Sequence, residues 1–195
     1  MVHFIETELR HILISVLVLA VAVSGIGFLS LEDTGYRFAA ISIPLALGFI
    51  THELTHKYVA NRYGYFAVYR MWPLGLAFAL LIGLASGGRF IFAAPGAVVI
   101  LSSYFTRRQS GLIGLAGPVA NIAIAGCFFP LSYLPGVVGD IGLWGAYINL
   151  WLAFFNLLPI SPLDGKKVFS WKPAIWVAIE MPLLAFIVVL FQVNF

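Results

Sequence analysis

Apolar residues form five long runs along the chain, and each run is about as long as a helix that crosses a bilayer. Such a helix needs about 20 apolar residues, because it rises about 1.5 Å per residue. The runs cover residues 12–31, 38–61, 112–134, 141–158 and 174–193. The first run is too long for a signal sequence and lacks a clear cleavage site. The pattern therefore predicts five retained membrane helices.

A sixth apolar stretch, residues 71–105, does not fit a single helix. It is interrupted at residues 86–89 and again at Pro95 and Gly96. It forms either one more helix with a returning segment, or a helix followed by a short hairpin or re-entrant element over residues 90–101. Irregular backbone at membrane depth requires protein or water to satisfy its polar groups. We therefore expect an all-α polytopic membrane protein, a bundle of about six transmembrane helices, with a short membrane-associated β-hairpin or re-entrant element on the second interpretation.

The composition agrees with a membrane protein. Of the 195 residues, 62% are hydrophobic and 10% are charged, whereas soluble domains carry about 25% charged residues. No linker-like stretch divides the chain, so we expect a single domain over residues 1–195. Cys127 is the only cysteine, which excludes an internal disulfide and a cysteine-based metal cluster.

The basic residues favour one orientation in the membrane. They occur in small groups between the apolar runs, which is typical of topology signals and not of a nucleic-acid site. With a cytosolic amino terminus, the residues on the cytosolic side are Arg10, Lys57, Arg62, Arg70, Arg107, Arg108, Lys166, Lys167 and Lys172. Arg37 and Arg89 are the exceptions. We expect a multi-pass protein of the cell membrane that contacts the lipid bilayer and binds no nucleic acid.

The second apolar run contains the polar sequence HELTH, with His52, Glu53 and His56. Helical residues four apart share a face and lie about 5–6 Å from each other, so both imidazoles can reach one zinc ion at about 2.0–2.1 Å. Glu53 projects to an adjacent face and is suited to deprotonate an attacking water. Such groups are costly within a membrane, which favours a function. The alternative is that all three lie near the cytosolic helix end and reach water there with Lys57.

A catalytic zinc site needs a third protein ligand and an open position. His3 and His11 lie among charged residues before the first run, like an ordinary solvated terminus. Asp164 is the better candidate, because Pro159 and Pro162 end the preceding helix and an Asp-Gly turn can direct its carboxylate back into the bundle. The expected orientation places Asp164 on the same, cytosolic side as HELTH. The alternative is a plain turn residue that caps the next segment of the chain.

HELTH within a membrane run, followed by NLLPISPLDG, resembles the site-2 protease family of intramembrane zinc metalloproteases. That family pairs HExxH in one membrane helix with an Asn-x-x-Pro and Asp-Gly motif at the end of a later one. Gly117, Pro118 and Asn121 in AGPVAN resemble the family's small-residue span, and we interpret them mainly as helix packing. The resemblance covers about residues 38–167. Lys166 and Lys167 depart from the small residue that often follows Asp-Gly.

The resemblance implies that His52, His56 and Asp164 bind one zinc ion per chain, and that Glu53 activates the water. It also implies that Asn156 hydrogen-bonds the substrate carbonyl or the oxyanion, although a satisfied interhelical amide is the alternative. The expected activity is that of a zinc-dependent endopeptidase, which cleaves a transmembrane protein substrate in or near its membrane segment in regulated intramembrane proteolysis. A zinc-binding scaffold that does not cut, an ion transporter and a homo-oligomeric state are left open.

Overall fold

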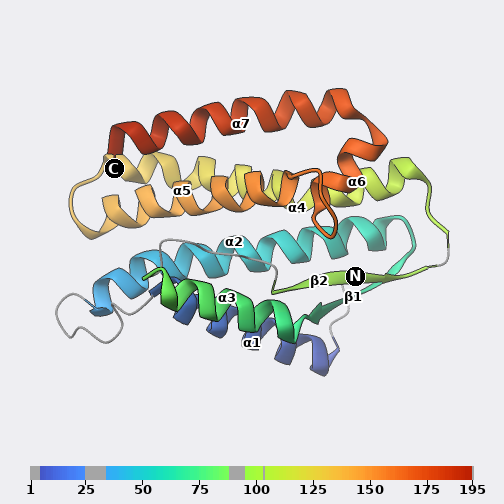
Figure 1. The fold of residues 1–195 in the computed structure, drawn as a ribbon, viewed down its shortest axis with the longest axis horizontal. Helices are drawn as coiled ribbons and strands as arrows, with labels where there is room; N and C mark the ends of the chain where they lie inside the picture. Colours follow the sequence, from blue (N-terminus) through green and yellow to red (C-terminus); the bar gives the residue numbers. More distant parts are fainter. Residues whose placement is uncertain (1–4, 25–33, 88–94, 103, 195) are drawn as a thin grey trace.

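The structure is a computed structural model that describes residues 5–24, 34–87, 95–102 and 104–194. Its elements are α1 (Glu6–Ser24), α2 (Thr34–Arg62), β1 (Phe66–Met71), α3 (Pro73–Ala85), β2 (Gly96–Leu101), α4 (Arg107–Phe128), α5 (Val137–Leu157), α6 (Asp164–Trp171) and α7 (Pro173–Asn194). The long helices lie side by side along one direction, and the two strands lie at one end of them (Figure 1). The protein is therefore elongated, with distinct ends.

The described parts of the five apolar runs lie mainly on α1, α2, α4, α5 and α7. Polar residues mark where a helix begins, as at the start of α4. Thr106 Oγ1 accepts a hydrogen bond from Gln109 N at 3.2 Å, and Gln109 Oε1 accepts one from Thr106 N at 2.9 Å. This reciprocal capping box satisfies two backbone donors that a helix start otherwise leaves without partners.

The predicted bundle of about six transmembrane helices is wrong. Within the described ranges, two segments are long and apolar enough to cross a membrane, Arg107–Tyr133 and Val137–Leu157. The first combines α4 with a 3₁₀ turn, Phe129–Tyr133. The helix α3 has 13 residues, a length of about 20 Å, which is less than the roughly 30 Å of hydrocarbon. Counting apolar residues overlooked how early α3 ends.

The all-α class is wrong as well, because β1 and β2 form an antiparallel sheet. Phe66 pairs with Leu101, and Met71 pairs with Gly96. A hairpin was expected within residues 90–101. Residues 90–94 lie outside the described part of the chain, and the described residues 96–101 form the strand β2. The partner of β2 is instead a strand that precedes α3, and Trp72 N donates to Pro95 O at 2.8 Å to extend the pairing. Sequence distance hid this pairing, because a whole helix connects the two strands.

Helix α2 is the central element of the fold. It packs against α4 and α5 on one side and against α1 and β1 on another. Leu45 and Phe49 of α2 share a buried cluster with Leu19 of α1 and Leu152 of α5. A second cluster, with Leu157 as a member, joins α4, α5, α6 and α7. Polar side chains on the middle and carboxyl-terminal part of α2 are therefore enclosed by protein on several sides.

Candidate metal centre and active site

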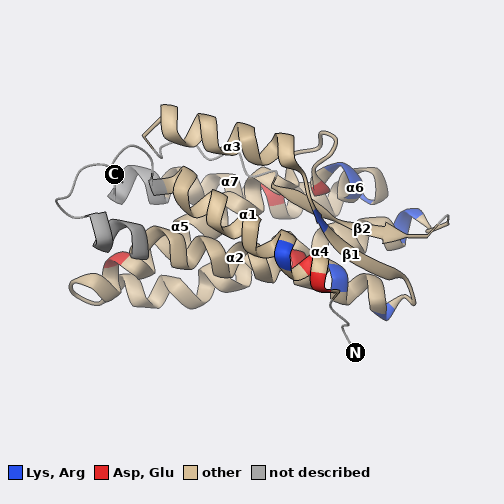
Figure 2. Cartoon of the chain, turned by 90° about the horizontal axis from the view of Figure 1, so that it is seen from below, with Lys and Arg blue, Asp and Glu red and all other residues tan. Residues whose placement is uncertain are grey.

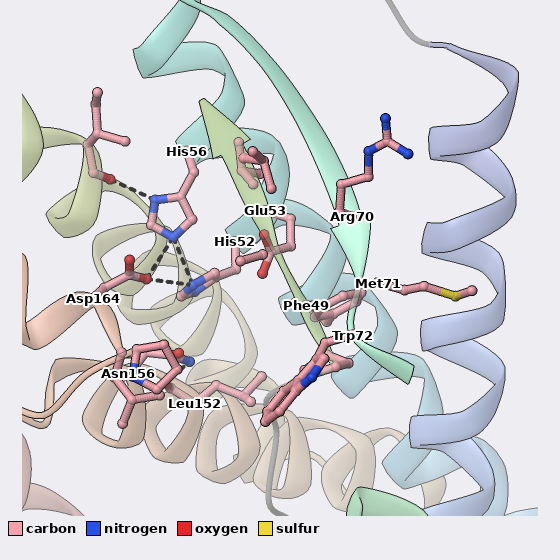
Figure 3. A pocket seen from close by; sticks show the side chains of 18 of the residues that line it. Phe49, His52, Glu53, His56, Arg70, Met71, Trp72, Leu152, Asn156 and Asp164 are labelled. Carbon is pink, nitrogen blue, oxygen red and sulfur yellow. Dashed lines mark hydrogen bonds and ion pairs between the residues drawn. The ribbon is translucent and has the colours of Figure 1, made fainter. Parts of the chain in front are cut away.

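Three side chains converge between α2 and the start of α6. His52 and His56 lie on α2, one turn apart, and Asp164 is the first residue of α6. Asp164 Oδ2 lies 3.3 Å from His52 Nε2 and 2.9 Å from His56 Nε2, and the two Nε2 atoms are 3.0 Å apart. All three residues are buried, and Figure 3 shows their polar atoms directed at one another. The structure thus brings together the three residues that the sequence predicts as ligands.

Hydrogen bonds to the far side of each ring set its orientation. His56 Nδ1 donates to Ile113 O at 2.6 Å, and His52 Nδ1 lies 2.6 Å from Asn121 Oδ1. A carbonyl oxygen can only accept, so Nδ1 of His56 carries a proton. Its Nε2 therefore offers a lone pair to the centre when the ring is neutral. Metal-binding histidines are commonly oriented in this way by a partner of the second ring nitrogen.

The partners on α4 repeat at the same spacing as the histidines on α2. Ile113, Gly117 and Asn121 are four residues apart, as are His52 and His56, and the two helices run in opposite directions. A Cβ at Gly117 would lie 2.6 Å from His52 Nε2 and closer still to His56 Nε2. Only glycine lets α4 approach the pair this closely. Part of AGPVAN therefore accommodates the histidines.

The donor set fits zinc. Zinc is bound by histidine nitrogen and carboxylate oxygen in tetrahedral sites, and bonds of about 2.0–2.1 Å separate two ligands by roughly 3.3 Å. The three separations here, 2.9, 3.0 and 3.3 Å, are close to that value. Two neutral imidazoles that both donate through Nδ1 cannot hydrogen-bond each other through Nε2. Convergence of three acceptor atoms is favourable when a cation lies among them.

A non-helical segment, residues 158–163, separates the end of α5 from the start of α6 and places Asp164 beside the histidines. The carbonyl of Leu157, at the end of α5, accepts a hydrogen bond from Trp176 Nε1 at 2.6 Å. Leu163 occupies the N-cap position of α6 without a side-chain cap, and Asp164 is the first residue of the helix. Lys167 Nζ donates to Asp164 Oδ1 at 2.7 Å, which leaves Oδ2 for the histidines.

The electrostatic surroundings keep Asp164 charged. Burial by itself would raise the pKa of the Asp164 carboxyl. When no cation lies at the centre, the charge of a protonated His56, the Lys167 ammonium and hydrogen bonds from the two imidazoles hold that pKa well below its usual range. A carboxylate, and not a carboxylic acid, binds a divalent cation. The surroundings of Asp164 therefore favour the protonation state that a metal ligand needs.

Glu53 lies beside the three candidate ligands and not among them. It is buried, and its Oε2 has no hydrogen-bond partner within the described part of the chain. The backbone of Val98 in β2 hydrogen-bonds the carboxylate. Glu53 borders a cavity of about 500 Å³ that is also lined by the three ligands and by β2 (Figure 3). A buried carboxylate oxygen without a partner, next to a cation site, is placed to take a proton from water.

Asn156 lines the same cavity. Its Nδ2 donates to Leu152 O of its own helix at 2.9 Å, so this bond is not the interhelical contact considered as the alternative. An amide group carries two N–H donors, and one bond to Leu152 occupies one of them. His11 lies on α1 and is not a member of the cluster, while His3 lies outside the described residues.

Sequence reasoning missed three groups that hold the ligands. Asn121 was interpreted as packing, although its spacing of four from Gly117 within an apolar helix was a usable signal. Lys167 was noted as a departure, and not as a partner of Asp164. The acceptor for His56 is the backbone carbonyl of Ile113, and a backbone group leaves no trace in the residue type.

Curated proteins resemble this chain over most of its length. A candidate zinc metalloprotease, MJ0611 of Methanocaldococcus jannaschii, is 41% identical over 186 residues, which make up 94% of each chain. Candidate zinc metalloproteases YwhC of Bacillus subtilis (30% over 148 residues, 65% of each chain) and Rip3 of Mycobacterium tuberculosis (27% over 133 residues, 65% of this chain and 29% of that protein) are similar too. No protein-family model and no solved structure matches. With its HELTH and NLLPISPLDG motifs, the chain belongs to the site-2 protease family of zinc metalloproteases.

Proposed function

We propose that the protein is an intramembrane endopeptidase in which His52, His56 and Asp164 hold one zinc ion and Glu53 is the general base. The observation that carries the proposal is the buried Glu53 Oε2, which has no partner within the described part of the chain. It lies beside three convergent ligand atoms, in a cavity of about 500 Å³. The proposed substrate is a peptide bond in or near a transmembrane segment of another protein.

Zinc, when bound, acts as a Lewis acid that polarises water and the substrate carbonyl. Glu53 Oε2 takes a proton from the water as its oxygen forms a bond to the carbonyl carbon. Glu53 then returns the proton to the amide nitrogen as the C–N bond breaks, which leaves a carboxylic acid and an amine. The acid proton passes to the amine, and the products are a carboxylate and an ammonium group. The second N–H of Asn156 donates to the carbonyl oxygen as negative charge develops there.

The edge of β2 that faces away from β1 pairs with no other strand of the described residues, and it is suited to hold an extended substrate. Tyr69 N donates to Glu8 Oε1 at 2.9 Å and therefore points away from β2. Tyr69 lies directly opposite Val98 of β2. In an antiparallel sheet, two directly opposed residues either both bond across the ladder or both point their backbone groups outward. The N–H and C=O of Val98 therefore point away from β1. Gly96 and Ile100, two residues to either side, share this direction and line the cavity. A substrate helix that has unwound, as hydrolysis of its peptide bonds requires, can pair along this edge.

We further propose that the protein is embedded in the cell membrane as a multi-pass protein, with its site open to the cytosol. Two apolar segments of the described chain are long enough to cross a bilayer. The Lys and Arg residues with described side chains gather in the half of the molecule that contains the sheet (Figure 2). This asymmetry supports a cytosolic location for that half, because basic residues are enriched on the cytosolic side.

The test uses the full chain in liposomes with a single-span substrate that contains a helix-breaking residue. We expect zinc-dependent cleavage within the apolar segment, located by mass spectrometry of the fragments. Glu53→Gln should cut about 10²- to 10⁴-fold more slowly and retain its zinc. The matched control is Glu6→Gln, since Glu6 is exposed and pairs with Arg10 of its own helix. Equal product from wild type and Glu53→Gln contradicts the proposal, as does cleavage confined to soluble segments.

Proline substitutions test the role of the β2 edge. Proline lacks the N–H and is tolerated at strand edges that face away from a partner. Ile100→Pro removes an N–H from the cavity side, so we expect about tenfold slower cleavage with the sheet retained. Val99→Pro is the comparison, because Val99 belongs to the alternate set that bonds β1, and it should disrupt the sheet. Cleavage at the wild-type rate by a folded Ile100→Pro variant would show that the substrate does not pair here.

A further inference from the structure

Two asparagines from different helices meet in the interior behind the metal centre. Asn121 on α4 and Asn149 on α5 are both 0% exposed. Asn149 Nδ2 donates to Gly145 O at 2.9 Å and to Pro44 O at 3.3 Å. With both N–H groups directed at carbonyl oxygens, the Asn149 amide has a single favourable orientation. Its Oδ1 then faces Asn121.

The oxygen of Asn149 sets the orientation of Asn121 in turn. Asn121 Nδ2 donates to Asn149 Oδ1 at 3.0 Å and to Gly48 O at 3.1 Å, which uses both of its N–H groups. The remaining acceptor, Asn121 Oδ1, faces His52 Nδ1 at 2.6 Å. If the amide were turned over, its oxygen would face two acceptors and its N–H groups would face Nδ1. The proton of a neutral His52 therefore lies on Nδ1.

The close contact of three helices leaves little room for another arrangement. A Cβ at Gly48 would lie 3.2 Å from Asn121 Nδ2 and would overlap Asn149 Oδ1. The two amides thus meet where α2 has no side chain. Buried amides that satisfy each other in this way are restricted to one hydrogen-bonding pattern.

We infer that Asn149 is a positioning residue for the zinc ligand His52 and acts on it through Asn121, without touching it. When Asn149 is lost, only Gly48 O still favours the present orientation of the Asn121 amide, so the amide turns over more often and then offers Nδ2 to the ring. His52 then moves its proton to Nε2, and a protonated Nε2 cannot bind a metal ion. This inference rests on the proposed function, which makes His52 a zinc ligand.

Zinc affinity of the full chain in detergent, measured by competition with a chromophoric chelator, tests the inference. We expect Asn149→Leu to bind zinc about 10- to 100-fold more weakly than wild type, the range seen when a partner of a ligand is lost. Nitrogen-15 shifts of His52 in the metal-free protein should show Nδ1–H in wild type and a mixture of tautomers in the variant. The control is Glu180→Leu, which removes another buried polar group, on α7, and should leave the zinc affinity unchanged.

A second variant separates orientation from folding. Both oxygens of a carboxylate accept, so in Asn121→Asp the His52 N–H has an acceptor whichever way the group turns. Adding Asn149→Leu to Asn121→Asp should therefore change zinc affinity by less than about threefold. An equal loss in both backgrounds, or wild-type affinity in Asn149→Leu, would overturn the inference.

The same zinc measurements separate a failure of the proposed function from a failure of this inference. Wild type that binds no zinc, or a His56→Ala variant that binds as tightly as wild type, would overturn the ligand assignment and the inference with it. If wild type needs His56 for zinc and Asn149→Leu still binds normally, the ligand assignment stands and only the role of Asn149 is overturned.

Discussion

Two buried polar clusters lie on different sides of α2. Consecutive residues of this helix, His56 and Lys57, contribute to one cluster each. His56 faces α4 and Asp164, where it joins the metal centre. Lys57 faces α1, where its Nζ donates to Glu8 Oε2. Glu8 Oε1 accepts from Tyr69 N at 2.9 Å, and the Tyr69 hydroxyl bonds Ser15 Oγ at 2.8 Å. We call these four side chains, Glu8, Ser15, Lys57 and Tyr69, the α1 cluster.

The two clusters differ in whether their polar groups are satisfied internally. In the α1 cluster, both oxygens of Glu8 accept hydrogen bonds and the Lys57 ammonium has its counter-ion. At the metal centre, three acceptor atoms meet, and Glu53 Oε2 has no partner within the described part of the chain. Buried polar groups in proteins are normally paired. The incomplete cluster is therefore the one that indicates a ligand, while the complete one holds α1, α2 and β1 together.

Loss of a metal ligand should have the largest effect on function and a small one on folding. We expect His56→Ala to weaken zinc binding by about 1,000-fold or more, because one of three ligands is removed. The metal-free variant should lose only about 1 kcal/mol of unfolding free energy, since Ile113 O loses one donor. Chelator competition and denaturant unfolding in detergent measure the two quantities. Strong destabilisation of the metal-free variant would show that the metal centre, like the α1 cluster, is needed for folding.

Breaking the α1 cluster should have the reverse effect. Glu8→Ala leaves Lys57 charged in a site where it is 2% exposed, so we expect a loss of about 3–5 kcal/mol in unfolding free energy. Zinc affinity of the folded fraction should not change. Replacing both partners, as Glu8→Leu with Lys57→Met, should restore most of the stability. A single variant as stable as wild type would show that this ion pair is not desolvated.

The link between Lys167 and Asp164 should have a smaller effect on zinc. Lys167→Met removes the hydrogen bond to Asp164 Oδ1, and the carboxylate is then free to rotate. We expect zinc affinity to fall about tenfold, at the low end for partners of ligands, because the Lys167 side chain is 43% exposed. The neighbouring Lys166→Met variant serves as the control and should bind like wild type. Equal affinities for the two variants would contradict a role for Lys167.

Removing one hydroxyl from the α1 cluster should have the smallest effect. Tyr69→Phe loses the hydrogen bond to Ser15, for which we expect a loss of about 1 kcal/mol in unfolding free energy and no change in zinc affinity. The control is Tyr104→Phe, because Tyr104 is 89% exposed. A change in zinc affinity for Tyr69→Phe would mean that the two clusters are coupled through α2.

Local periodicity explains which parts of the fold and site were predictable. The described parts of the five long apolar runs are mainly helical, and the spacing of His52 and His56 places both on one face of α2. The position of Asp164 after two prolines indicated a carboxylate at a helix break, and the structure brings it to the histidines. The membrane-span count and the all-α class were wrong, and the pairing of β2 with β1 was not expected, because apolar content does not determine helix ends or strand partners.

The sequence by itself determined the family and the residue types of the candidate ligands, since these follow from HELTH and NLLPISPLDG, and each of these motifs is local. Only the tertiary structure decided that β2 pairs with β1 across α3, that Lys57 faces Glu8, and that the Asn121 amide presents its oxygen to His52. These outcomes depend on the direction of hydrogen bonds between segments distant in the chain. A direction of this kind is set only when several helices pack together, because each group then has to satisfy its neighbours at the same time.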